Sequence, residues 1–295
     1  MFTRLAQSWE LTKQSWAVLR ADKHLLLFPV FSGIAILVVL ALVLVPAGVL
    51  MSAMGVFVHE SQRPAGEAAF VETIQFKALC TAILFVIYFA CFTVATFFNV
   101  ALMACAMARF NGEDSSAKAG LGLAWKRLPQ ILAWSAVNAT VGVILQMLKE
   151  RAGFLGRWVL SLVGLAWTIA TFFVVPVLVV EGVGPIDAVK RSAAVLKKTW
   201  GQSLAAQVGV SAALSIASIA VLLVLVGGGI LAAIFVSGWL GGILIVLGIL
   251  IMLALALVAA TLKQIITAAC YRFASTGLVP EQFDGQSLRS MFVTK

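Results

Sequence analysis

Two long stretches of this chain contain no charged residue, and they constrain its fold more than any other feature. Residues 25–58 and residues 203–262 hold no Asp, Glu, Lys or Arg. A helix needs about 20 apolar residues to cross a hydrocarbon core about 30 Å thick. The whole chain is 62% hydrophobic and 11% charged, which is more apolar surface than a soluble core can bury. The sequence therefore predicts an all-α polytopic membrane protein, with residues 1–295 forming one transmembrane domain.

Six transmembrane helices account for the apolar runs. Four are expected at about residues 25–50, 78–107, 128–148 and 158–180. The stretch 203–262 is long enough for two more, provided that it turns back once. "SGWLGG" at Ser237–Gly242 is the favoured turn, and Gly227–Gly229 is the alternative.

Basic residues divide unequally between the two sides of the membrane. Sixteen of the 21 Lys and Arg residues fall on the side that holds the N-terminus under this six-span topology. Because Lys and Arg accumulate in cytoplasmic loops, we expect both termini to be cytoplasmic. No run of Lys and Arg exceeds two residues, so the net charge of +9 is attributed to these loops. Nucleic acid is not expected as a partner.

Three polar segments on the cytoplasmic side have the pattern of interfacial amphipathic helices. They are residues 2–24, the segment that follows Ser115 or Ser116 as its N-terminal cap, and the segment that begins at Pro185. Apolar residues recur every three to four positions in them, with Trp and basic residues between. We expect these helices to lie on anionic lipid headgroups. The candidate headgroup contacts are Arg20, Lys126, Arg127, Lys197 and Lys198.

The tetrapeptide ATFF suggests an internal repeat. It occurs at residues 95–98 and 170–173, and Ala260-Thr261-Leu262 is a poorer third copy. Each full copy precedes a turn with Gly and an acidic residue and then a basic amphipathic segment. The chain accordingly divides into three repeats of an interfacial helix plus a two-span hairpin, at residues 1–110, 111–181 and 182–280, with a polar C-terminal tail at 276–295. The alternative is that any three such hairpins look alike.

Four polar residues within the spans form a candidate intramembrane cluster. They are Asn99, Asn138, Gln264 and Lys263. One interpretation is a polar pathway between the spans. We favour the other, in which the amides make interhelical hydrogen bonds worth about 0.6–2 kcal/mol each. Lys263 then extends its ammonium to the membrane interface.

Catalytic and metal-binding patterns are missing from the sequence. It has no GxSxG, HExxH or P-loop motif and no paired carboxylates in a long cytoplasmic loop. The four cysteines form no CxxC pattern, and the two histidines, His24 and His59, fall on opposite sides of the membrane. We therefore expect no enzyme activity, no cofactor and no metal.

Four blocks carry a resemblance to a known family. They are "RLAQSWELTKQSWAVLRADKHLLLFPVFSG", "ATFFNVALMACAMARFNGED", "LAWKRLPQILAW" and "ATFFVVPVLVVEGVGPIDAVKRSAAVLKKTWG". Together they resemble a bacterial family of uncharacterised integral membrane proteins, a domain of unknown function that begins with an R-L-x-x-S-W amphipathic helix. The repeated plan is also similar to the membrane portion attached to some glycerophosphodiester phosphodiesterases, whose catalytic barrel has no counterpart here. The resemblance implies a bacterial cytoplasmic (inner) membrane and supplies no site residues.

Two functions of different classes follow from these observations. The first is a non-enzymatic inner-membrane protein that organises lipid or a membrane-protein partner through its cytoplasmic-face amphipathic helices and self-associates as a homo-oligomer. The alternative is a small-solute transporter or channel with a polar pathway between spans two, three and six, lined by Asn99, Asn138 and Gln264.

Overall fold

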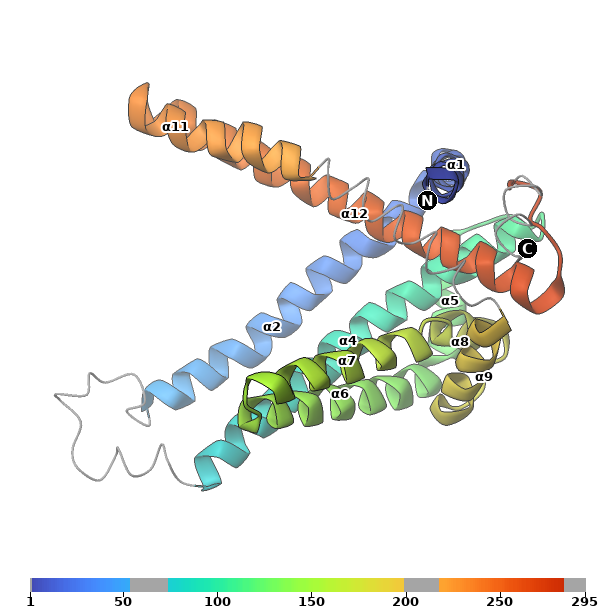
Figure 1. Ribbon diagram of the computed structural model, residues 1–295, viewed down its shortest axis with the longest axis horizontal. Helices are drawn as coiled ribbons and strands as arrows, with labels where there is room; N and C mark the ends of the chain where they lie inside the picture. The colour runs from blue at the N-terminus through green and yellow to red at the C-terminus, as the bar shows by residue number, and fades with distance from the viewer. Residues whose placement is uncertain (1, 54–73, 199–217, 284–295) are drawn as a thin grey trace.

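The computed structural model describes residues 2–53, 74–198 and 218–283 of the chain. Every regular element in those three ranges is helical (Figure 1). Six helical stretches are long and apolar enough to cross a membrane, which confirms the all-α, six-span prediction. These stretches are Lys23–Ser52, Phe76–Phe110, Leu128–Arg151, Phe154–Val180, Ser218–Phe235 and Gly238–Thr276.

The first two spans begin and end close to the expected residues. A short 3₁₀ helix, η1 (Lys23–Leu26), leads into α2 (Leu27–Ala53). Pro29 lies in the first turn of α2, where its missing N–H costs little. The second span is α4 (Ile74–Phe110), whose 37 residues make it about 55 Å long at about 1.5 Å per residue. It therefore extends beyond the hydrocarbon core.

The fourth span, expected at 158–180, is confirmed at Phe154–Val180, and it consists of two helices. After α5 (Ala117–Lys126) and α6 (Leu128–Arg151), α7 (Phe154–Ala170) ends and α8 (Val174–Val180) begins after three turn residues. Pro176 explains the break, because a proline ring clashes with the carbonyl four residues earlier in a continuous helix. Within α8 the proline falls in the first turn, where it is tolerated.

One buried serine satisfies backbone groups on both sides of this break. Ser192 lies on α9 (Pro185–Lys198). Its hydroxyl donates to the carbonyl of Ala170 at 2.7 Å and accepts from the N–H of Phe173 at 2.9 Å. The two copies of ATFF therefore differ in backbone, since the first copy lies inside the continuous helix α4 and the second spans the break.

The last apolar stretch turns where the favoured prediction placed it. A π-helical turn, η3 (Leu222–Gly227), continues into α11 (Gly228–Phe235), so the alternative turn at Gly227–Gly229 lies within helix. The chain reverses at Val236 and Ser237, and the Ser237 hydroxyl accepts from the N–H of Leu240 to cap α12 (Gly238–Thr276). Gly229 and Gly241 let α11 and α12 approach so closely that a Cβ on either would meet the other helix.

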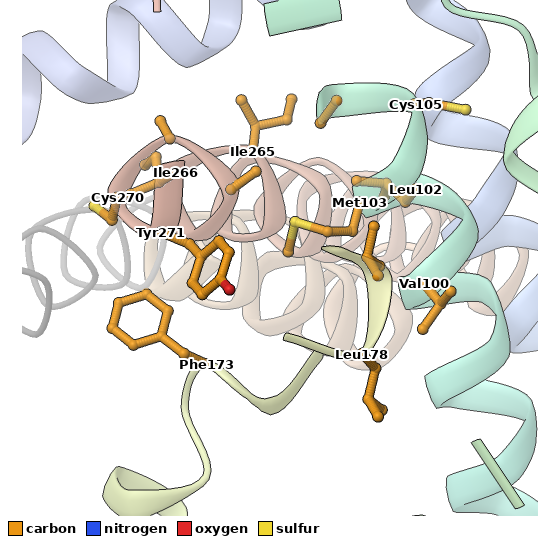
Figure 2. Packing of buried hydrophobic residues seen from close by; sticks show 14 of the residues in the cluster. Val100, Leu102, Met103, Cys105, Phe173, Leu178, Ile265, Ile266, Cys270 and Tyr271 are labelled. Carbon is orange, nitrogen blue, oxygen red and sulfur yellow. The ribbon is translucent and has the colours of Figure 1, made fainter. Parts of the chain in front are cut away.

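Buried side chains concentrate at one end of the spans, which we call the helical base. It comprises the C-terminal third of α4, the whole of α8 and the C-terminal third of α12, with the chain segments packed on them (Figures 1 and 2). Phe173 contacts Tyr271 there, with ring centroids 6.0 Å apart, and both are almost fully buried. Figure 2 labels these residues of the buried cluster: Val100, Leu102, Met103, Cys105, Phe173, Leu178, Ile265, Ile266, Cys270 and Tyr271.

Away from the base the spans expose apolar side chains. The α11–α12 hairpin extends in a different direction from α4, α6 and α7 (Figure 1). Trp239 at its turn is 88% exposed, and Leu42 in the middle of α2 is 69% exposed. Lipid tails are as apolar as these side chains, so such surfaces are compatible with a membrane and not with water.

Candidate functional site

Three helices that are not among the six candidate spans lie at the helical base (Figure 1). α1 (Phe2–Ala21) packs against α12, α5 packs against α4, and α9 packs against α8. Each buries one side in the core that the spans share. The buried residues of the three helices include Val18 and Leu19 of α1, Ala124 of α5, and Ala188, Val195 and Leu196 of α9.

α5 is held tightly at its start. The Ser116 hydroxyl accepts from the N–H of Ala119 at 3.2 Å, so Ser116 and not Ser115 is the cap. Gly120 lies so close to Cys105 and the backbone of Ala101 on α4 that any Cβ would collide with them. The Cys105 thiol also donates to the Ser116 carbonyl at 3.3 Å. The glycine and the cap together fix how α5 sits on α4.

A carboxylate joins α9 to the ends of two spans. Glu181 follows α8, and its Oε1 accepts from Arg191 Nε of α9 at 3.0 Å and from the Tyr271 hydroxyl of α12 at 2.9 Å. The hydrogen bond to Glu181 raises the pKa of the Arg191 guanidinium. Since Tyr271 is only 1% exposed, this bond anchors Glu181 to the interior of the base.

Arg127, which precedes α6, and Gln130, in the first turn of α6, contact the end of α8 and the loop after it. Arg127 Nη2 donates to the Val179 carbonyl at 3.5 Å, and Gln130 Nε2 donates to the Gly182 carbonyl at 3.3 Å. Gly182 has φ +63°, and a Cβ there would collide with the Arg127 guanidinium. The polar contacts of this loop therefore tie α6, α8, α9 and α12 together.

The N-terminal segment is tied to the base by two polar pairs. Asp22, between α1 and η1, lies 3.5 Å from Arg109 Nε at the end of α4. His24 Nε2 lies 3.1 Å from the Ser115 hydroxyl, just before α5. These contacts place the end of α1 beside α4 and α5.

The five candidate headgroup residues have different surroundings. Arg20 is exposed, with its guanidinium 5.4 Å from the Trp16 ring, and Lys126 and Lys197 are also exposed. Arg127 points inward, toward Val179 and Gly182. The side chain of Lys198 lies outside the described residues.

The four intramembrane polar residues are half-buried, and the amide of Asn138 has a partner that sequence reasoning missed. Its Oδ1 accepts from Trp167 Nε1 on α7 at 3.1 Å. Within the ranges that the structure describes, no hydrogen bond joins the side chains of Asn99, Asn138, Gln264 and Lys263 to one another. The available signal was Trp167 itself, since a Trp inside a span needs an acceptor for its N–H.

A family model, described as a family of unknown function (DUF6159), matches residues 78–280, which is more than half of the chain. The matched residues include α5, α9 and the buried part of α12, and they leave out α1 and α2. Neither a curated protein nor a solved structure matches the chain significantly.

Proposed function

The chain belongs to this family of unknown function, DUF6159, and we propose from its own residues that it is a non-enzymatic protein that organises anionic lipid. The lipid-binding face would be the outer side of α1, α5 and α9 at the helical base. The excess of Lys and Arg on this side supports a cytoplasmic location for that face. The bacterial inner membrane is part of the same proposal.

The observation that carries the proposal is the pairing of a buried side with a basic exposed side on all three helices. Among the side chains that the structure describes, seven basic residues of these helices are exposed: Lys13, Arg20, Lys118, Lys126, Lys190, Arg191 and Lys197. Lys13, Lys190 and Arg191 have carboxylate neighbours, at 3.5, 3.7 and 3.0 Å. The other four have no ion-pair partner among the residues described, so their charges face outward uncompensated.

Electrostatics gives a magnitude for the effect. A Lys or Arg near an anionic membrane surface contributes about 1 kcal/mol of attraction. That is about a fivefold preference per residue for an anionic over a neutral headgroup beside it, given that about 1.4 kcal/mol is tenfold. Because screening lengths are about 10 Å at 0.1 M salt, the preference should weaken as salt is raised.

Lipid enrichment around the reconstituted protein tests the proposal. The full chain would be placed in nanodiscs with a fixed mixture of phosphatidylglycerol and phosphatidylcholine, and the lipid retained after detergent extraction would be quantified. The double variant Lys126→Gln/Lys197→Gln should lower the enrichment of phosphatidylglycerol. The matched variant Lys149→Gln/Arg157→Gln removes the same charge from the opposite end of the spans and should not. Equal enrichment in both double variants would overturn the proposal.

Transport is the competing function, and a separate measurement decides it. The hydrogen bond from Trp167 to Asn138 gives Asn138 a role in joining α6 to α7, which favours packing over a pathway. Flux of small solutes into liposomes containing the protein would be compared with flux for Asn99→Leu. Solute movement that this change abolishes would replace the lipid-organising proposal with a transporter.

A further inference from the structure

A groove lies between α4 and α6 at the end of the spans opposite to the helical base. Its volume is about 700 Å³, within the range of about 300–1,000 Å³ typical of small-molecule sites. Phe85 and Val86 of α4 and Val143 and Met147 of α6 form its apolar walls. Lys77 and Arg151 line the same groove.

Helical spacing places the two cations together at one end. Residues 77, 81 and 85 lie in one row along α4, and residues 143, 147 and 151 lie in one row along α6, because positions four apart share a face. Lys77 lies near the start of α4 and Arg151 ends α6. The two helices run in opposite directions, so both basic residues stand at the outer end of the groove and the apolar residues lie deeper.

Both cations are available to a ligand. Lys77 and Arg151 are exposed. Among the residues that the structure describes, neither side chain has a hydrogen-bond or ion-pair partner. Glu150 precedes Arg151 in sequence, and its Oε1 accepts from Gln146 Nε2 at 3.1 Å. Glu150 does not line the groove.

The length of the groove matches one leaflet of a bilayer. From Lys77 to Val86 the axis of α4 advances about 13 Å, and from Val143 to Arg151 that of α6 advances about 12 Å, at about 1.5 Å per residue. Half of a hydrocarbon core about 30 Å thick is about 15 Å. A phosphate at the cations would therefore lie at the membrane surface, with an acyl chain along the apolar walls.

We propose that this groove is a binding site for one anionic phospholipid, with its phosphate on Lys77 and Arg151 and one acyl chain against Phe85, Val86, Val143 and Met147. The site is separate from the lipid-binding face of α1, α5 and α9, which lies at the other end of the spans. It also differs in kind, because it holds a single lipid in a defined place instead of enriching lipid along a surface.

Native mass spectrometry of the full chain in detergent tests this site. Phosphatidylglycerol would be titrated against phosphatidylcholine with the same acyl chains, and the first lipid adduct per chain would be quantified. We expect one preferred phosphatidylglycerol adduct. Lys77→Gln/Arg151→Gln should weaken it roughly 25-fold, from about fivefold for each of the two cations. Lys149→Gln/Arg157→Gln, which removes two neighbouring charges that do not line the groove, should change it far less.

A second variant keeps the charges and blocks the acyl chain. Ala82 is exposed and lines the groove, so Ala82→Phe should fill it and abolish the preferred adduct. Ala166→Phe adds the same ring at an exposed position of α7 that does not line the groove and should leave the adduct intact. The proposal would be overturned if Ala82→Phe left the adduct unchanged or if both lipids gave equal adducts. A dimer mass without bound lipid would also overturn it, because the groove would then be an interface with a second copy of the chain.

Discussion

Replacing Gly182 by alanine tests how the loop after α8 is held at the helical base. Gly182 has φ +63°, a conformation that residues with a Cβ rarely adopt. The new methyl group would also occupy the position of the Arg127 guanidinium. Arg127 donates to the carbonyl of Val179, so displacing it removes a contact between the start of α6 and the end of α8.

The two effects give a magnitude for Gly182→Ala. A left-handed backbone conformation costs about 1–2 kcal/mol for a residue with a side chain. Hydrogen bonds of charged groups contribute about 1.5–3 kcal/mol, and we take about 1 kcal/mol because the distance from Arg127 Nη2 to the Val179 oxygen is 3.5 Å. The total loss of about 2.5 kcal/mol corresponds to a drop in Tm of about 5–10 °C, at about 2–4 °C per kcal/mol.

Thermal unfolding of the purified protein in detergent, at one fixed scan rate, measures this loss. Gly112→Ala is the matched control, because Gly112 also has a positive φ of +78° but has open space around it. Gly112→Ala should therefore lose only about 1–2 kcal/mol of stability, which is what the left-handed backbone conformation costs. In an Arg127→Ala background, Gly182→Ala should likewise cost only about 1–2 kcal/mol. If Gly182→Ala costs no more than Gly112→Ala, and its cost is unchanged without Arg127, the guanidinium does not occupy the position described.

Two further substitutions test contacts between helices by the same unfolding measurement. Ser192→Ala should destabilise the protein by about 1–3 kcal/mol, because the carbonyl of Ala170 and the N–H of Phe173 both lose their buried partner at the break between α7 and α8. Asn138→Leu should cost about 0.6–2 kcal/mol, because the indole N–H of Trp167 is left without an acceptor inside a span.

Each of these two predictions has a control with the same kind of change. Ser161→Ala and Thr140→Val remove exposed hydroxyls that donate only to the carbonyl four residues earlier in their own helix. Both should stay within about 0.5 kcal/mol of the unmodified protein. A cost for Ser192→Ala as small as that for Ser161→Ala would mean that the break is held by other contacts. A cost for Asn138→Leu as small as that for Thr140→Val would mean that the hydrogen bond from Trp167 to Asn138 does not stabilise the protein.

The sequence was sufficient to predict the spans because their signal is local. A charge-free run that exceeds the thickness of the bilayer core has few alternatives to a helix, since backbone groups in lipid must be satisfied internally. The turn at Ser237 was predictable for a related reason. Its hydroxyl caps α12, while the run Gly227–Gly229 has no such residue and continues as helix.

Contacts between helices distant in sequence were not predictable. The break before Val174 depends on Pro176, which was visible, but also on Ser192, which supplies the missing hydrogen bonds from another helix. Tyr271 and Glu181 are 90 positions apart, and nothing in their sequence neighbourhoods indicates that they meet. Two candidate lipid contacts, Arg20 and Arg127, look alike in sequence, yet one is exposed and the other points inward.

The contrast between the two ends of the spans has one physical cause. In lipid, apolar helices gain little from contact with one another, so polar and close-packed contacts decide where they associate. Many of the polar contacts lie at the helical base, where one residue, Glu181 at the end of α8, bonds to both α9 and α12. At the opposite end Lys77 and Arg151 have no partner within the described ranges, and the walls between them are apolar. An anionic lipid supplies both a negative charge for Lys77 and Arg151 and an apolar chain for the walls. A further helix would supply both only if it carried a carboxylate at the depth of the two cations.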